Sequence, residues 1–165
     1  MSKVFRLRSV QKIPVPLSDA WTFFSNPHNL VTITPPFLNL QVKNEVFEKE
    51  VYPGQVLLYT VKPLLGIPLE WMTEITHVEK EKIFVDEQRK GPYKLWHHQH
   101  HFKAISNGVE MTDIVHYRLP FGVLGSVAHA LVIKNKLKTI FYYRYNKIIE
   151  MFGDHDKTGT NITMD

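Results

Sequence analysis

The 165-residue sequence contains no cysteine, which excludes a disulfide framework and a thiolate metal site. It also lacks any run of roughly 18 uncharged apolar residues, the length that a membrane-spanning helix needs. Near the N-terminus, Lys3, Arg6 and Arg8 interrupt the apolar residues, so the unbroken apolar stretch of a signal peptide is missing. These absences predict a cytoplasmic protein without membrane insertion.

Charge of one sign is not concentrated along the chain, although basic residues give a net charge of +4. Lys134, Lys136 and Lys138 are close together, but their spacing indicates one solvated side of a helix rather than a strip for nucleic acid. We therefore expect no nucleic-acid partner. An apolar fraction of 44% and a charged fraction of 22% are ordinary for a globular protein with a substantial core.

Alternating apolar and polar residues predict a first strand over residues 4–14. Two short helical segments follow, the first opening at Pro16 and ending at Asn26-Pro27. Turn residues then separate six further strand candidates, over 38–47, 55–62, 69–78, 82–88, 94–106 and 109–119. Their regular spacing favours an antiparallel sheet of about seven strands.

No proline occurs from Gly122 to Phe152, where apolar residues recur at three- and four-residue steps, as in a helix. The apolar stripe includes Leu137, Phe141, Tyr145 and Ile148. A helix of about 28–30 residues is ~42–45 Å long and must lie across the sheet. We therefore expect one α+β domain over residues 1–152. Residues 153–165 lack a periodic apolar pattern and are expected to form a disordered tail.

Asn107-Gly108 predicts a two-residue type I′ hairpin turn, because both residues tolerate positive φ. This turn pairs Ser106 with Val109 and, further along, His100 with Val115. Strand alternation then gathers one largely apolar set of side chains on a single face, which should be the concave face toward the helix. The set comprises Trp96, His98, His100, Phe102, Met111, Asp113, Val115, Tyr117 and Leu119.

Four polar groups lie in this otherwise apolar surface: His98, His100, Asp113 and Tyr117. A buried carboxylate is costly unless it is paired, which favours contact between Asp113 and His100. Polar groups that converge inside an apolar pocket are typical of a ligand site. Two alternatives stay open, namely a structural network within the sheet and a catalytic acid/base pair of His100 and Asp113.

The run His97–His101 also raises the question of a metal site. Alternation divides it, because His98 and His100 point one way while His97 and His101 point the other. The outer pair has His116 nearby but no obvious carboxylate, whereas zinc usually takes four ligands. We expect no bound metal and no cofactor.

Several linked motifs resemble a group within the SRPBCC superfamily (START-like, polyketide cyclase/dehydrase-like). They are Asp86-Glu87-Gln88, Gly91-Pro92-Tyr93, Trp96-x-His98-x-His100-x-Phe102, Met111-x-Asp113-x-Val115-x-Tyr117 and Leu119-Pro120-Phe121-Gly122. The resemblance implies the helix-grip fold, a curved antiparallel sheet around a long C-terminal helix that encloses a deep cavity. It also favours inward-pointing side chains for Asp86 and Gln88.

The pattern as a whole predicts binding, sequestration or transport of a small hydrophobic or amphipathic ligand. The candidate ligand contacts are His98, His100, Asp113, Tyr117, Trp96, Phe102, Met111, Val115, Trp71, Asp86 and Gln88. Segments 33–37 and 64–66 are either lids of the cavity or caps on the end of the sheet. Two other functions stay open: a cyclase- or dehydratase-type enzyme, and a protein-interaction domain without a ligand. Aromatic residues on all sides of segment 142–145 also leave a homodimer open.

Overall fold

The computed structural model describes residues 3–44, 48–63, 66–120, 132–155 and 161–165. Its helices are α1 (Leu17–Phe24) and α3 (Lys134–Phe152), with 3₁₀ turns η1 (Pro27–Leu30) and η2 (Pro36–Leu38). Its strands are β1 (Phe5–Ile13), β2 (Gln41–Val42), β3 (Val56–Val61), β4 (Leu69–Glu79), β5 (Ile83–Lys90), β6 (Leu95–Ile105), β7 (Gly108–Arg118) and β8 (Asn161–Met164).

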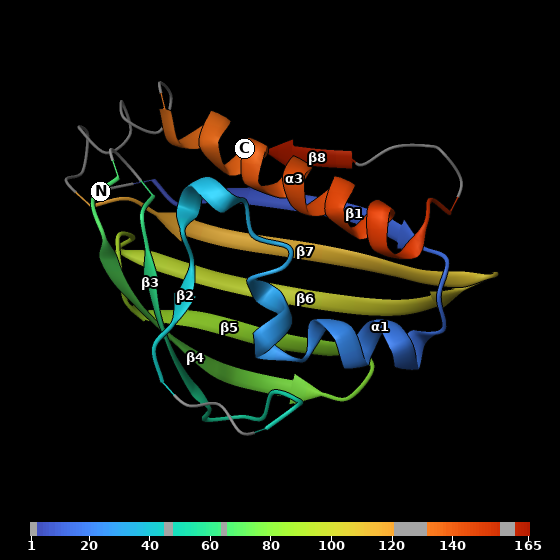
Figure 1. Cartoon of the computed structure of the whole chain (residues 1–165). Coiled ribbons are helices and arrows are strands. Elements are labelled where there is room, and N and C mark those ends of the chain that lie inside the picture. The colour runs from blue at the N-terminus through green and yellow to red at the C-terminus, as the bar shows by residue number, and fades with distance from the viewer. Residues whose placement is uncertain (1–2, 45–47, 64–65, 121–131, 156–160) are drawn as a thin grey trace.

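These strands form one antiparallel sheet in the order β2-β3-β4-β5-β6-β7-β1-β8. Figure 1 shows that α1 and α3 lie on the same face of this strongly curved sheet. The pairing of β4 with β5 shifts register at Met72/Thr73 and again at Ile75/His77, and such irregularities bend a strand. The helix-grip architecture expected from the sequence is confirmed, with eight described strands instead of about seven.

The β6–β7 hairpin differs from the predicted register by two residues. Its loop is Ser106-Asn107, so that Ile105 pairs with Gly108 and His100 lies opposite Asp113. Asn107 alone adopts the left-handed conformation in this turn, with φ 58°. Gly108 is needed for packing instead, because a Cβ atom there would lie 2.4 Å from the carbonyl oxygen of Ile13. The glycine therefore marks a close approach between strands and does not belong to the turn.

A shift of two residues keeps every side chain on its predicted face. The inward set along β6 and β7 is buried apart from the half-buried Trp96, as the alternation predicted. The opposite face of the hairpin is half-buried or exposed, including His97, His101 and His116. The concave face therefore carries the predicted side chains, but each residue of β6 pairs with a different residue of β7 than predicted.

The last helix is described from Lys134 onward, so the start predicted near Gly122 lies outside the described residues. Its buried side chains are Leu137, Phe141, Arg144 and Ile148, which recur at steps of four, three and four residues. An arginine therefore occupies the apolar stripe where the sequence analysis placed Tyr145.

The expected disordered tail is wrong for residues Asn161–Met164. They form β8, which pairs with β1 from Leu7 to Val10 at the edge of the sheet (Figure 1). Ile162 and Met164 alternate toward the core and pack near Leu7. An apolar alternation of only two residues is too short to stand out in a polar segment.

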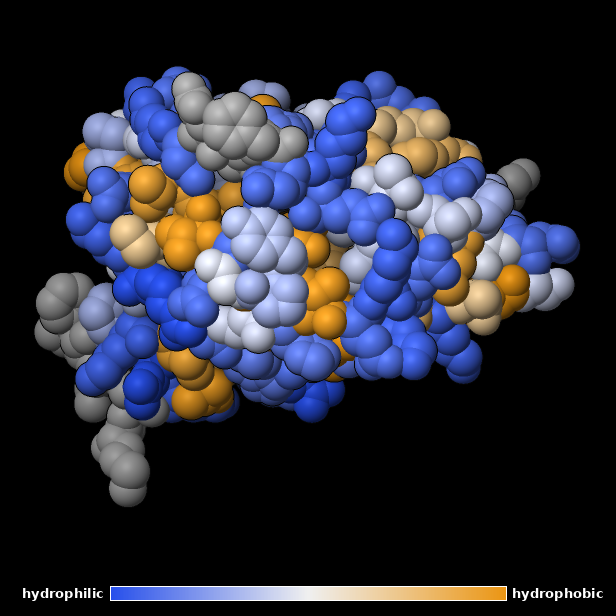
Figure 2. Space-filling view, turned by 90° about the horizontal axis from the view of Figure 1, so that it is seen from below, coloured by the Kyte–Doolittle hydropathy of each residue, from blue (hydrophilic) through white to orange (hydrophobic). Residues whose placement is uncertain are grey.

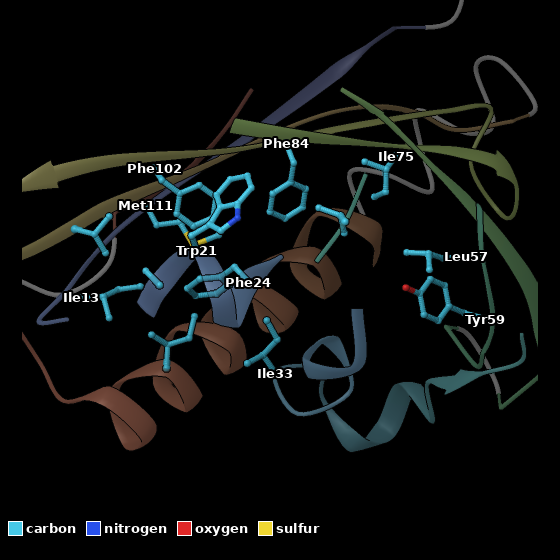
Figure 3. Close-up of a cluster of buried hydrophobic side chains, with 14 residues drawn as sticks. Ile13, Trp21, Phe24, Ile33, Leu57, Tyr59, Ile75, Phe84, Phe102 and Met111 are labelled. Atoms are coloured by element: carbon cyan, nitrogen blue, oxygen red, sulfur yellow. The ribbon is translucent and has the colours of Figure 1, made fainter. Parts of the chain in front are cut away.

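The concave side of the sheet holds two clusters of buried apolar side chains. In the larger one, the Trp21 ring makes edge contacts with Phe84 and Phe102, at centroid distances of 6.0 and 5.4 Å. Figure 3 shows this group beside the sheet, with Leu57 and Tyr59 separated from it on another side of the interior. Leu57 and Tyr59 on one side, and Phe24 and Phe84 on the other, line a cavity.

The outer surface is mixed in character. Figure 2 shows apolar side chains in separate groups between hydrophilic ones on the face seen from below. Among the described residues, no helix combines the length and the apolar character needed to cross a bilayer.

Candidate functional site

A cavity of about 220 Å³ opens between the concave face of the sheet and the helices. Most of its wall is apolar and comes from α1, η1, β3, β4 and α3; it includes Phe24, Leu30, Leu57, Ile75, Leu137 and Phe141. A concave apolar space with a few polar groups is the usual form of a small-molecule site.

The charged and imidazole side chains of the wall lie where β5, β6 and α3 meet. Asp86 from β5, His98 and His100 from β6, and Arg144 from α3 all line the cavity. Asp113 from β7 lies directly behind the histidines, because the observed register sets it opposite His100. We call these five residues the polar cluster.

The two imidazole rings of the polar cluster lie next to each other, tilted by 39°, between its two carboxylates. Their centroids are 3.8 Å apart, because the two histidines alternate onto one face of β6. His98 Nε2 lies 3.0 Å from Asp113 Oδ1, and His100 Nε2 lies 2.8 Å from Asp86 Oδ2, both as hydrogen bonds. The second nitrogens also face carboxylates: His98 Nδ1 lies 3.4 Å from Asp86 Oδ2, and His100 Nδ1 lies 2.9 Å from Asp113 Oδ1.

The surroundings of the two histidines shift their pKa values in opposite directions. His100 Nδ1 lies 2.9 Å from Asp113 Oδ1 without the geometry of a hydrogen bond, so the directed bond of His100 is the one between Nε2 and Asp86. Burial opposes a charge on this ring, but the carboxylates of Asp113 and Asp86 outweigh burial and raise the pKa of His100. Burial and the neighbouring charge of His100 lower the pKa of His98, which is therefore the neutral partner.

Both carboxylates of the polar cluster are ionised. Burial alone would raise the pKa of Asp113, but Arg144 and the two histidines outweigh it and hold that pKa well below its usual range. Burial likewise opposes ionisation of Asp86, and the charges and hydrogen bonds of His98, His100 and Arg144 together lower its pKa. Ionised carboxylates persist in a buried site only when they are paired in this way.

Arg144 is the residue of this site that the sequence analysis missed. It is only 9% exposed, its Nη2 lies 3.6 Å from Asp113 Oδ1, and its guanidinium lies over the Phe24 ring at 5.5 Å. Its Nε has no hydrogen-bond partner within the described parts of the chain. The signal was available, because Arg144 follows Phe141 by three residues on the apolar stripe.

Tyr59 is a second residue that the sequence did not single out. It lines the cavity from β3 and is buried, and Figure 3 shows its hydroxyl turned toward the interior. Burial and the charge of Asp86 raise the pKa of Tyr59, so the phenol stays protonated and can donate a hydrogen bond.

The structure brings five of the predicted ligand contacts to the cavity wall: Trp71, Trp96, Asp86, His98 and His100. The Trp71 and Trp96 rings meet edge to face at 5.3 Å, next to Tyr93. The other predicted contacts are not among the cavity-lining residues: Asp113, Tyr117, Phe102, Met111, Val115 and Gln88.

Those six residues have other places in the fold. Phe102 and Met111 belong to the apolar cluster around Trp21, and Val115 and Tyr117 pack with Phe5 and Leu7. Gln88 exchanges two hydrogen bonds with the backbone of Tyr93, at 2.6 and 3.3 Å, and so fixes the turn after β5. Its side chain therefore serves this turn rather than the cavity.

The candidate lid segments are only partly at the cavity. Ile33 and Thr34 line it, whereas Phe37 is 48% exposed. Pro63 also lines the cavity, but residues 64–65 lie outside the described part of the chain.

Three donor atoms of the polar cluster could approach a metal ion. Asp86, His98 and His100 each offer one atom, and these atoms lie within 4.8 Å of one another. They are engaged in the hydrogen bonds described above, and the buried guanidinium of Arg144 already supplies positive charge to the same cluster. A divalent cation would add two further positive charges there, so the geometry fits a hydrogen-bonded ion cluster better than a metal centre.

Comparison with known proteins finds solved structures of the same fold, all at low sequence identity among those described below. No family model matches the sequence, and no curated protein matches it. A protein from Chromobacterium violaceum superposes with a TM-score of 0.67 at 11% identity, over 91% of this chain and 99% of that one. Major latex-like protein 151 from Panax ginseng superposes with a TM-score of 0.65 at 13% identity, over 90% and 97%.

A third structure, a nucleoside-diphosphate sugar epimerase from Corynebacterium glutamicum, has a TM-score of 0.61 and 21% identity. It covers 87% of this chain, which matches only 28% of that larger protein. Identities this low show a common helix-grip fold and leave function to be inferred from the site.

Proposed function

We propose that this chain binds a small hydrophobic or amphipathic molecule in the cavity, to sequester or carry it. The observation that carries the proposal is a largely apolar cavity of about 220 Å³ whose charged and imidazole side chains, Asp86, His98, His100 and Arg144, are gathered in one part of the wall. Apolar walls would supply affinity at about 25 cal/mol per Å² of buried apolar surface. The polar cluster would orient one end of the ligand.

Binding is favoured over catalysis by the way the imidazole nitrogens are used. A general base needs a nitrogen within reach of the substrate's proton. All four ring nitrogens of His98 and His100 lie 2.8–3.4 Å from carboxylate oxygens. His100 Nδ1 lacks hydrogen-bond geometry there but is itself buried, so it does not reach a molecule in the cavity. The acid/base pair of His100 and Asp113 is therefore better understood as part of the support beneath the polar wall.

The proposal is tested by filling the cavity. Leu57 is 3% exposed and lines it, whereas its neighbour Val56 is 44% exposed on the other face of β3. We expect Leu57→Trp to weaken uptake of 1-octanol at least tenfold and Val56→Trp to leave it unchanged, measured by isothermal titration calorimetry on folded protein. Native mass spectrometry of protein purified from its own host would then show whether a small molecule co-purifies.

Equal affinities of the two variants would refute the cavity as the binding site. Absence of binding by the wild-type protein, together with no co-purified molecule, would instead favour a protein-interaction domain. Circular dichroism of both variants separates a filled cavity from a misfolded protein.

A further inference from the structure

The two halves of α3 are attached to the rest of the protein in different ways. In the second half, the carbonyl oxygen of Tyr145 accepts a hydrogen bond from Gln11 of β1 at 3.1 Å. The ring of Phe152 meets the ring of Phe23 from α1 edge to face at 5.0 Å. Ile148 is 1% exposed and packs into the larger apolar cluster. The second half is therefore anchored to both β1 and α1.

The first half of α3, from Lys134 to Phe141, is covered by the C-terminal strand β8. Leu137 and Phe141 belong to the smaller apolar cluster on the sheet. Ile162 and Met164 of β8 pack against the same cluster. Lys134 Nζ donates a hydrogen bond of 3.5 Å to the carbonyl oxygen of Met164. Figure 1 shows β8 beside α3, next to β1 at the edge of the sheet.

The first half of α3 is also a wall of the cavity. Leu137, Ile140 and Phe141 line it, whereas Ile162 and Met164 are not among the cavity-lining residues. A molecule that enters or leaves beside this half of the helix has to displace its side chains. Because β8 packs against the same part of α3, it limits how far that part of the helix can move away from the sheet.

The attachment of β8 is small enough to be broken and remade. Its four residues pair with β1 from Leu7 to Val10, and among the described strands it has β1 as its single neighbour. Ile162 and Met164 are half-buried. Asn161 and Thr163, which alternate with them, are exposed. Segments with few buried contacts open locally at a much lower free energy than global unfolding requires.

We propose that β8 is a strap that holds the first half of α3 over the cavity, and that its release from β1 lets the ligand enter and leave. The inference rests on the proposed binding function. With β8 detached, the first half of the helix can move away from the sheet while the contacts of Tyr145 and Phe152 keep the second half in place. The strap thus sets the rate of ligand exchange and has little influence on affinity, because its side chains do not line the cavity.

A disulfide clamp tests the strap in one direction. Arg8 and Thr163 are directly paired between β1 and β8, and Cα atoms in such pairs are about 4.5–5.5 Å apart, within the reach of a disulfide. The sequence contains no cysteine, so Arg8→Cys/Thr163→Cys introduces this bridge alone. We expect the oxidised variant to exchange 1-octanol at least fivefold more slowly than its reduced form, measured by NMR line-shape analysis. Calorimetry should give the two forms affinities that agree within about twofold.

Loosening the strap tests the opposite direction. Ile162→Asp combined with Met164→Asp removes both apolar contacts of β8, so 1-octanol should exchange at least fivefold faster than in the wild type. Thr163→Asp is the matched control, because Thr163 lies on the same strand but is exposed, and it should leave the exchange rate unchanged. Amide hydrogen exchange in β8 shows whether the strand is detached in the double variant and paired in the control.

Two results would overturn the strap while binding itself stands. One is equal exchange rates in the oxidised and reduced forms of the clamped variant. The other is a wild-type exchange rate in the double variant although hydrogen exchange shows that β8 is detached. If wild-type protein does not bind 1-octanol, the proposed function fails and the strap fails with it. The clamp compares one folded protein in two redox states, so it decides the matter even if the double variant does not fold.

Discussion

Strand β6 carries two pairs of histidines in opposite surroundings. On the concave face, His98 and His100 are each 6% exposed and lie between the buried carboxylate of Asp113 and the half-buried carboxylate of Asp86. On the outer face, His97 is bonded to Glu87 at 2.8 Å and His101 to Gln99 at 2.9 Å, in half-exposed positions. The same residue type on one strand thus takes part in a buried ion cluster or in a solvated surface network.

The difference lies in what water can replace. On the outer face, a lost partner is replaced by solvent, and ion pairs there contribute about 0–1 kcal/mol. On the concave face, each charge depends on the others, because His100, Asp113 and Arg144 are at most 9% exposed and little solvent can compensate for a missing partner. Sequence alternation decides which pair receives which surroundings.

The sharpest test of this contrast is Asp113→Asn. The change keeps the size of the side chain but removes the charge that pairs with His100 and Arg144. We expect a loss of about 3–5 kcal/mol in the free energy of unfolding, measured by urea denaturation. The outer-face counterpart Glu87→Gln should cost less than about 1 kcal/mol. Similar losses from both would contradict the contrast.

A change of pH should have a smaller effect on the free energy of unfolding. Because the pKa of His100 is raised in the folded state, its stabilising contribution is complete below about pH 6.5 and is lost as pH rises through the folded value. The stability difference between wild type and His100→Gln should therefore be largest on the acid side and shrink toward alkaline pH. Urea unfolding from about pH 5 to about pH 9 measures it.

High salt should change this pH dependence little, since buried pairs are weakly screened. A difference that grows with rising pH would show that His100 is neutral in the folded protein.

The smallest effect is expected on the outer face. Replacing both His97 and His101 with Gln should change the free energy of unfolding by no more than about 0.5 kcal/mol, since solvent can replace their bonds. The same variant should bind 1-octanol like the wild type. A loss of affinity would mean that the outer face contributes to the site.

Much of the fold could be predicted from simple patterns in the sequence. Alternation along β6 and β7 sorts the side chains onto two faces, and the run without proline predicts the final helix. The register was wrong because Gly108 was taken as part of the turn, whereas its missing Cβ admits the Ile13 carbonyl oxygen. The group that approaches Gly108 belongs to strand β1, nearly a hundred residues away in sequence, so no local pattern could reveal it.

The site was predicted less completely than the fold. Alternation indicated the inward faces of His98, His100 and Asp113, but it could not tell which of them reaches the cavity and which lies behind. Arg144 was overlooked because a charged residue on an apolar stripe is ordinarily solvated. Its burial depends on carboxylates contributed by two separate strands, β5 and β7, and no local pattern encodes that arrangement.

The short strands at the two ends of the sheet bear on self-association. Among the described residues, the sheet ends in the two-residue β2 on one side and the four-residue β8 on the other. Short edge strands offer few free amide and carbonyl groups to another chain, a common protection against edge-to-edge pairing. Continuous extension of the sheet into a second copy therefore has little backbone to use, and a homodimer would have to form through side chains instead.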